Sequence, residues 1–451
     1  MNFVDYSRLI GEDRGAPSAV AERVAIRIGR IRYQLAIGLL FGVVVPLLLR
    51  TRIEQWPDAA VHYDNSVLGT VVAVLIGFTI FRKVSVLPGA GSFVNIVPAF
   101  VSSYSIVMIS FFALRLDYSR AQFAVSILLV IASFYAIAFL MSRFRHARFV
   151  LVTNRVISQM RPIRGVEWVH AKQTATAETY RHLPIVVDHS SVQLTEDWER
   201  YLAEEAISGR LIYDRQAIVE ALQGRVPLPQ TKGDAESALS LRTLHAPGHL
   251  VPDSIYAPAK RYLDLLMAIV VLLLLSPVLC LTAVAIRLES PGPVLFKQSR
   301  MGYRGRPFTM LKFRSMRFER RVPASSDADM TLTDDQRITR VGRFIRRTRI
   351  DELPQIINII RGEMSWIGPR PETLRLSEWY ESEIPFYRYR HIVRPGITGW
   401  AQVNQGHVTS VEDVREKLEF DFYYVKHFTL WTDLLILVKT VIVVLTGHGS
   451  K

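Results

Sequence analysis

The sequence predicts a membrane protein in three parts. These are a four-helix transmembrane region over residues 1–148, a small cytosolic α/β module with a linker over 149–250, and a mixed, mainly helical domain over 251–451. Hydrophobic residues make up 49% of the chain and the mean hydropathy is +0.18, which is high for a fully soluble protein. Four long apolar segments precede residue 148, and the composition then becomes mixed. A membrane location follows from these features.

Each of the four apolar segments approaches the ~20 residues that a helix needs to cross the hydrocarbon layer. Basic residues precede the first segment and follow the second and fourth, which places those ends in the cytoplasm. The first thirty residues lack the pattern of a cleavable signal peptide, so the first segment is expected to be retained. The segments are Tyr33 to Leu49, Val67 to Phe81, Phe93 to Leu114 and Phe123 to Met141.

The net charge of +14 suits an anionic partner such as a phosphorylated lipid, a nucleotide or the surface of membrane lipids. No nucleic acid partner is expected, because no helix-turn-helix, RNA-binding or zinc-finger pattern is present. The single cysteine, Cys280, excludes intramolecular disulfides and cysteine-based zinc sites.

The middle region reads as a small α/β unit. Residues 185–188 and 210–214 are predicted strands, and residues 197–208 form an amphipathic helix. A dinucleotide-binding site would need a glycine-rich turn, and this region has none, so a structural or regulatory role is expected. The polar stretch from Pro227 to Ser240 is a predicted linker.

A long apolar helix is predicted over residues 260–287, interrupted in its middle by Ser276 and Pro277. Basic residues flank both ends, so the charge rule gives no direction. Proline removes a backbone donor and favours a bend, so the helix either spans the membrane with a kink or enters and leaves on the cytoplasmic face. Near the C-terminus, Leu430 to Leu445 is interrupted by Asp433 and Lys439, which favours an interfacial amphipathic helix.

The residues most able to perform chemistry lie between 292 and 406. Residues 297–317 interleave basic, aromatic and glycine residues, among them Lys312 and Arg314, as expected where a backbone approaches phosphate. Residues 348–362 are predicted to form one helix with Asp351 and Glu352 in its first turn, where the helix dipole favours negative charge. An acidic pair at a helix start is usually a cap.

The neighbourhood of this pair favours chemistry over capping. A run of arginines, including Arg346, precedes it, and Arg370 follows in a Gly-Pro-Arg-Pro sequence. A carboxylate can attack phosphorus and form an acyl phosphate if metal and arginine neutralise the diester's charge. Mg²⁺ is the expected cofactor, with Asp351 and Glu352 as its candidate ligands, because it prefers oxygen ligands.

Six ordered motifs resemble the bacterial sugar transferase family, the monotopic polyprenyl-phosphate phosphoglycosyl transferases, over about residues 257–451. Large members of exopolysaccharide pathways are similar in carrying four extra transmembrane helices and a cytosolic module. The motifs are Ser276-Pro277, Lys312-Phe-Arg-Ser-Met316, Asp351-Glu-Leu-Pro-Gln355, Arg361-Gly-Glu-Met-Ser365, Gly368-Pro-Arg-Pro371 and Arg394-Pro-Gly-Ile-Thr-Gly-Trp400.

The resemblance implies roles for individual residues. Asp351 is the expected nucleophile, and Glu352 is its partner in activating the acceptor and binding Mg²⁺. Arg346 and Arg370 are implied phosphate and nucleotide contacts, to which Lys312 and Arg314 are expected to add. Ser276 and Pro277 match the break of a re-entrant membrane helix, which favours a domain that stays on the cytoplasmic face.

The implied reaction transfers a sugar-1-phosphate from a UDP-sugar to undecaprenyl phosphate and releases UMP. It would be the first membrane step of exopolysaccharide or capsule synthesis, with glucose or galactose as the expected sugar. A homodimer is a candidate assembly for so large a membrane domain. Two departures from the family pattern are a short middle module and Asn404-Gln405-Gly406 after Trp400, where many relatives have glycine directly after asparagine.

Two other functions fit parts of the sequence. Asp327-Ala-Asp329 spells the Asp-x-Asp of metal-dependent nucleotide-sugar glycosyltransferases, although its Ser-, Thr- and Asp-rich surroundings favour a loop. A non-catalytic membrane scaffold for polysaccharide assembly would use the carboxylates only as caps.

Overall fold

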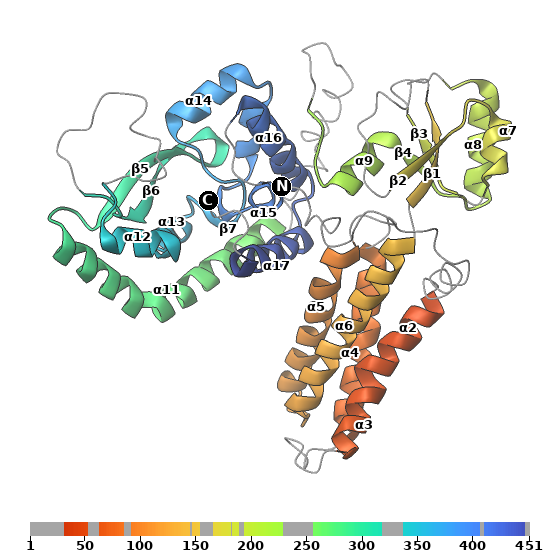
Figure 1. Cartoon of the computed structure of the whole chain (residues 1–451), viewed down its shortest axis with the longest axis horizontal. Coiled ribbons are helices and arrows are strands. Elements are labelled where there is room, and N and C mark those ends of the chain that lie inside the picture. The colour runs from red at the N-terminus through yellow and green to blue at the C-terminus, as the bar shows by residue number, and fades with distance from the viewer. Residues whose placement is uncertain are drawn as a thin grey trace, which may run out of the picture. The chain divides into compact units, whose positions relative to one another are not determined.

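The structure of the protein is a computed structural model. It describes residues 31–52, 63–84, 92–144, 147–153, 166–181, 183–188, 194–228, 256–317, 337–405 and 410–446. The chain divides into two compact units, residues 2–224 and residues 225–451 (Figure 1), and each unit is described by itself.

Long apolar helices open the N-terminal unit, and each has a stretch long and apolar enough to cross a membrane. Three of the predicted segments lie within these helices, and the third along the chain extends one residue, Leu114, beyond the end of α5. The second helix is longer than predicted because polar residues at both ends of its apolar stretch are also helical. The elements are α2 (Ile31–Leu39), the π-helix η2 (Leu40–Val44) and α3 (Val45–Arg52), which run without interruption, followed by α4 (Tyr63–Val84), α5 (Ser92–Ala113) and α6 (Arg120–Phe144).

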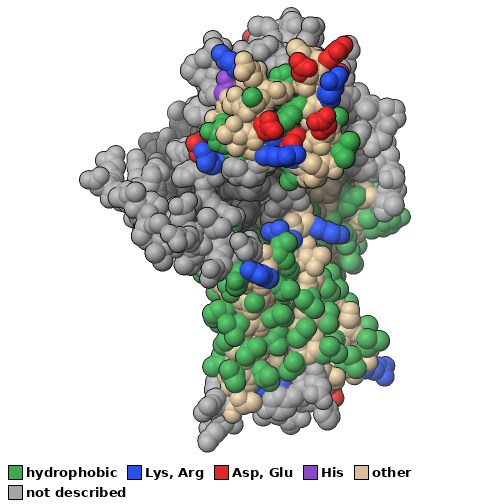
Figure 2. Space-filling model, turned by 90° about the vertical axis from the view of Figure 1, so that its right-hand side faces the viewer, with side chains coloured by type: hydrophobic (Ala, Val, Ile, Leu, Met, Phe, Trp, Pro, Cys, Tyr) green, Lys and Arg blue, Asp and Glu red, His purple; other side chains and the backbone are tan. Residues whose placement is uncertain are grey.

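Aromatic and small side chains pack the interior of this helical bundle. The rings of Phe100 and Phe134 lie 4.8 Å apart, and a Cβ atom on Gly77 would lie 2.6 Å from Phe100, so a glycine is needed there for close helix approach. The outward face is apolar instead of polar, with Phe112 83% and Leu128 68% exposed (Figure 2). Such a surface is matched to lipid and would be costly in water.

The module that follows is a four-stranded parallel sheet in the order β2-β1-β3-β4. Helices α7 and α8 pack on one face and α9 on the other, which is the usual way to bury a parallel sheet. The two predicted strands and the predicted helix are present as β3, β4 and α8, whereas β1, β2, α7 and α9 were not predicted. The bounds are β1 (Ala147–Val152), β2 (Val166–His170), α7 (Thr174–Thr179), β3 (Ile185–Val187), α8 (Glu196–Ile207), β4 (Ile212–Asp214) and α9 (Arg215–Gln223).

The C-terminal unit is mainly helical, with an antiparallel hairpin of β5 and β6 and a parallel pair of β7 and β8. Most of the predicted linker lies outside the described residues, but Val226 and Leu228 are buried against α16. The elements are α11 (Tyr256–Glu289), β5 (Leu295–Met301), η5 (Tyr303–Gly305), β6 (Pro307–Phe313), α12 (Arg340–Arg347), η7 (Ile350–Glu352), α13 (Gln355–Arg361), β7 (Ser365–Ile367), α14 (Leu374–Glu383), η8 (Tyr387–Ile392), β8 (Gly396–Thr398), α15 (Trp400–Asn404), α16 (Val411–Lys426) and α17 (Leu430–Thr446).

Helix α11 is bent and lies along one side of this unit (Figure 1). It is continuous through Pro277, where the sequence predicted a break. Proline cannot donate to the carbonyl of Leu273, but the Ser276 hydroxyl does so at 2.8 Å and satisfies that acceptor. Ala268, before the proline, packs beneath α13, and Ile286, after it, packs against β6 and α12. Both halves of the helix therefore contact the same unit.

Helix α17 is amphipathic, as predicted, and its polar side faces the protein. Asp433 is buried and accepts hydrogen bonds from Tyr256 and Lys260 of α11 and from Tyr424 of α16. Apolar side chains face outward, with Val444 71% exposed. The exposed faces of α11 and α17 are therefore both apolar, as expected for elements in contact with lipid.

The pair β7–β8 brings two glycines into backbone contact directly before the Gly-Pro-Arg-Pro segment. A Cβ atom on Gly396 would lie 2.1 Å from the amide nitrogen of Gly368, and one on Gly368 would lie 2.3 Å from the carbonyl oxygen of Arg394. Because the obstructing atoms are backbone, neither site can relax by a side-chain movement.

We predict that Gly396→Ala lowers the free energy of unfolding by about 3 kcal/mol, the upper range for overpacking, as measured by urea titration of the purified protein. Gly209→Ala is the control. No atom lies within 4 Å of its Cβ position and only its positive φ is unfavourable, so a loss of about 1 kcal/mol is expected. Equal losses in the two variants would contradict the close contact.

Candidate active site

The acidic pair lies in the short 3₁₀ turn η7, between α12 and α13. The predicted single helix over residues 348–362 is wrong in its first part, since Arg349 has a left-handed backbone (φ 58°) and α13 begins only after Pro354. Proline has no N–H to join a helical ladder, and here it is the N-cap. Gly362 ends the helix with φ 82°, as predicted.

Glu352 is the centre of a buried ionic cluster. Its Oε1 atom accepts from Arg370 Nη2 at 2.8 Å and from Lys312 Nζ at 3.2 Å, and Arg349 Nη1 lies 3.8 Å away. The side chain is 11% exposed. Burial favours the neutral acid, but Arg370 and then Lys312 outweigh it and lower the pKa of Glu352 to about 2. Glu352 is therefore an anion at neutral pH.

Asp351 lies beside this cluster in a different state. Its Oδ1 atom is buried and has no hydrogen-bond partner among the described residues. Burial, followed by the negative charge of Glu352, raises the pKa of Asp351, against the opposing effect of Lys312, Arg349 and Arg346. Two adjacent carboxylates thus have pKa values shifted in opposite directions, a pattern typical of catalytic pairs.

Lys312 reaches the cluster from strand β6, whose position depends on one buried residue of α13. Asn358 accepts from the amide of Leu311 at 3.0 Å and donates from Nδ2 to the carbonyl of Thr309 at 2.7 Å. It is 0% exposed and fastens the hairpin to the helix that follows the acidic pair. In the sequence, the only sign of this role is a polar residue on an otherwise apolar helix face.

The structure brings Lys312, Asp351, Glu352 and Arg370 together, with Arg346 close enough to affect Asp351. Arg346 Nε also donates to Ser315 at 2.7 Å. Arg314 is the predicted member that is not brought to the carboxylates. Its guanidinium donates to the carbonyls of Ser290 and Pro291, at 2.7 and 2.9 Å, and so fastens the loop after α11.

The carboxylates fit the predicted Mg²⁺ in number and kind. Mg²⁺ typically uses one or two carboxylates together with water and substrate phosphate. The buried, unpartnered Asp351 Oδ1 needs a cation or donor, whereas Glu352 Oε1 already accepts from two cations. No group of three acidic, His or Cys side chains suited to a metal occurs in the described ranges.

The structure bears in different ways on the Asp-x-Asp alternative and on the departure from the family pattern after Trp400. Asp327 and Asp329 lie outside the described residues, as does Gly406. Asn404 donates to the Trp400 carbonyl at 2.8 Å and accepts from Lys439 of α17, and Gln405 donates to the Asp413 carbonyl at 2.8 Å. These two residues therefore connect α15 to its neighbouring helices.

A cavity of about 700 Å³ lies elsewhere in the C-terminal unit. Arg261 and Arg394, which line it, donate to the last carbonyls of α13, at the opposite end of that helix from the acidic pair. None of Lys312, Asp351, Glu352 and Arg370 lines the cavity. The acidic pair, in contrast, combines the unpartnered buried Oδ1 of Asp351 with adjacent cations.

Comparisons with known proteins identify the family to which the chain belongs. The family model described as "Bacterial sugar transferase" matches residues 255–447. UDP-N-acetylgalactosamine-undecaprenyl-phosphate N-acetylgalactosaminephosphotransferase of Aeromonas hydrophila is 37% identical over 415 residues, which cover 92% of this chain and 95% of that protein.

Two further relatives are named UDP-glucose:undecaprenyl-phosphate glucose-1-phosphate transferase. The one from Escherichia coli K12 is 45% identical over 184 residues, 40% of this chain and 39% of the relative. The one from Caulobacter vibrioides is 40% identical over 237 residues, 52% of this chain and 86% of the relative. With similarity to the Aeromonas protein along nearly its whole length, the chain belongs to the bacterial sugar transferase family.

Proposed function

We propose that this protein transfers a sugar-1-phosphate from a UDP-sugar to undecaprenyl phosphate, giving undecaprenyl-diphospho-sugar and UMP. The observation that carries the proposal is the buried, unpartnered Oδ1 of Asp351 next to an ionic cluster that contains Lys312 and Arg370. The names of the relatives support the same substrates.

In the first step, a carboxylate oxygen of Asp351 attacks the phosphorus that bears the sugar. A P–O bond forms to Asp351 and the P–O bond to UMP breaks, so UMP leaves and an acyl phosphate holds the phosphosugar. The guanidinium of Arg370 and the ammonium of Lys312 stabilise negative charge on the phosphoryl oxygens. Mg²⁺ held by Asp351 and the substrate phosphates would add further charge neutralisation.

In the second step, a phosphate oxygen of undecaprenyl phosphate attacks the same phosphorus. The bond to Asp351 breaks, the carboxylate is regenerated, and the lipid-linked diphospho-sugar leaves. The anionic Glu352 keeps Lys312 and Arg370 in place during both steps.

The membrane arrangement supports a lipid acceptor. Both halves of α11 pack on the C-terminal unit while its other side chains, such as Leu274 at 72% exposure, face outward. A helix held this way suits a domain that rests on one face of the membrane. We propose that this is the cytoplasmic face, where UDP-sugars are made, and that α11 is re-entrant.

The names of the relatives indicate different donor sugars. The relative that matches along nearly the whole chain is named for N-acetylgalactosamine, whereas those matching mainly the C-terminal part are named for glucose. We propose that purified protein with undecaprenyl phosphate and Mg²⁺ releases UMP from one of UDP-N-acetylgalactosamine, UDP-glucose or UDP-galactose.

Asp351→Asn should reduce that UMP release by at least about 10⁴-fold, as expected when a covalent nucleophile is lost. The assay measures UMP from the active donor. The control is Asp197→Asn, an exposed acidic residue of the separate α/β module, which should leave turnover unchanged. Near-normal UMP release by folded Asp351→Asn protein would contradict the assignment of the nucleophile. Release of UDP instead of UMP by the unmodified protein would favour the Asp-x-Asp alternative, and no nucleotide release would favour the scaffold.

The pH dependence should report the ionisation of Asp351. Only the ionised carboxylate attacks, so activity falls as pH drops through the pKa of Asp351, which lies above the usual carboxyl value. Lys312 lowers that pKa, so Lys312→Met should raise it and move the acid limb of kcat/KM to higher pH by about one unit. Lys297→Met, an exposed lysine of β5, is the control. An acid limb that stays in place or moves to lower pH in Lys312→Met would contradict the assignment.

A further inference from the structure

The segment that carries Arg370 is held mainly through its carbonyl oxygens, although Gly368 N donates to the Thr398 carbonyl at 2.8 Å. In Gly368-Pro-Arg-Pro-Glu372, the prolines at 369 and 371 have no N–H group, so the backbone has few donors with which to fix itself. A guanidinium on such a loop would be mobile unless something else held the main chain. Mobility would be costly at a site where a displacement of 1 Å matters.

Four consecutive carbonyl oxygens of this segment each accept a hydrogen bond. Two donors are backbone amides, from β5 and from the start of β8, and two are guanidinium groups. The bonds run from Gly396 N to Pro369 O, from Arg390 Nη2 to Arg370 O, from Arg300 Nη1 to Pro371 O and from Met301 N to Glu372 O, each at 3.0 Å.

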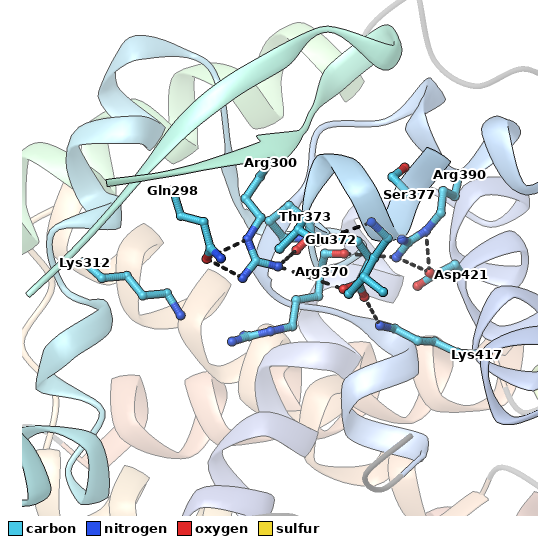
Figure 3. Close-up of polar contacts among 12 residues, drawn as sticks. Gln298, Arg300, Lys312, Arg370, Glu372, Thr373, Ser377, Arg390, Lys417 and Asp421 are labelled. Atoms are coloured by element: carbon cyan, nitrogen blue, oxygen red, sulfur yellow. Dashed lines mark hydrogen bonds and ion pairs between the residues drawn. The ribbon is translucent and has the colours of Figure 1, made fainter. Parts of the chain in front are cut away.

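Arg390 comes from η8 and is itself fixed in place. It is 2% exposed, and its Nη2 and Nε atoms donate to Asp421 of α16 at 2.7 and 3.0 Å (Figure 3). Its Nη1 donates to the Tyr387 hydroxyl at 2.7 Å. The planar fork reaches three partners in different directions, which the single ammonium of a lysine could not do.

Arg300 holds the next carbonyl from strand β5. Its Nη2 and Nε donate to Gln298 Oε1 at 2.7 and 3.2 Å, and Glu372 lies 4.0 Å away (Figure 3). Lys417 of α16 pairs with the same Glu372. Charges from β5, η8 and α16 thus converge on one short segment, although none of them contacts Asp351 or Glu352 in the part of the chain that the structure describes.

We propose that Arg390 and Arg300 are positioning residues that act on the reaction through Arg370, by clamping the carbonyl oxygens of residues 370 and 371. The inference rests on the proposed function, since it assigns these residues to the phosphoryl transfer at Asp351. Under this proposal, η8 and α16, which lie outside the acidic cluster, help to hold Arg370 in position beside Glu352 and the substrate phosphate.

The test compares the effect of Arg390→Lys in two backgrounds. With Arg370 present, the variant should lower kcat/KM for UMP release by roughly 10- to 100-fold, because a small displacement of a charge-stabilising group is costly. In the Arg370→Lys background the guanidinium group of residue 370 is already lost. There, Arg390→Lys should lower kcat/KM by less than about twofold, because the effects of coupled residues are non-additive. Arg375→Lys, an exposed arginine of α14, should be silent in both backgrounds.

Thermal stability distinguishes a positioning role of Arg390 from a purely structural role. Arg390→Lys perturbs the pair with buried Asp421 in either background, so Tm should fall equally in both, whereas the loss of activity should depend on Arg370. Arg300→Lys, at a side chain 16% exposed, supplies the same comparison if Arg390→Lys does not fold.

Equal fold-losses in the two backgrounds, or a double variant falling below detection while each single variant is measurable, would overturn the proposal. So would unchanged kcat/KM in Arg390→Lys and Arg300→Lys. Failure of the proposed function would look different, because the unmodified protein would then release no UMP from any UDP-sugar.

Discussion

The ionic cluster around Glu352 is the interaction on which the rest of the C-terminal unit depends. A carboxylate at 11% exposure is stable as an anion only because Lys312 and Arg370 lie against it. Burial, together with the fixed negative charge of Glu352, raises the pKa of Asp351, whose Oδ1 lacks a partner among the described residues. Each surrounding element supplies or orients one member of this set. Asn358 fastens the hairpin with Lys312, and the clamped Gly-Pro-Arg-Pro segment presents Arg370.

Helices α11 and α17 likewise direct polar side chains toward the protein interior, where these groups have hydrogen-bond partners. Helix α17 turns Asp433 toward Tyr256 and Lys260 of α11, and both helices leave apolar side chains exposed. The Ser276 hydroxyl satisfies the carbonyl that Pro277 cannot reach, so α11 bends without an unpaired group. Under the proposed function, this arrangement holds the carboxylates beside the lipid surface from which the acceptor phosphate would come.

Much of the architecture could be predicted from the sequence where the signal is local. The apolar segments before residue 148, the strand at 185–188, the helix stop at Gly362 and the amphipathic C-terminal helix all rest on composition or periodicity within one element. Strands β1 and β2 are harder to predict because charged residues lie within them, Arg148 in β1 and Glu167 in β2, whereas β3 is an uninterrupted apolar run. Helix α13 begins later than the sequence predicts, because Pro354 is its N-cap and does not lie in its first turn.

The sequence predicts most of the side chains that would perform the chemistry, but not the residues that hold them in place. Acidic, basic and proline-rich motifs indicated Asp351, Glu352, Lys312 and Arg370, yet residue type alone could not show that Arg314 donates to Ser290 and Pro291 instead. Asn358, Arg390 and Asp421 gave no local signal, since their partners lie far away in sequence.

The most direct test of the central claim is to locate the phosphosugar on the chain. The protein is mixed with its UDP-sugar and Mg²⁺ without acceptor lipid, quenched in acid, digested and analysed by peptide mass spectrometry. The account predicts one added phosphosugar on Asp351, released by hydroxylamine and by undecaprenyl phosphate. An adduct on a different side chain, or lipid-linked product formed at the normal rate with no adduct at any time point, would contradict it.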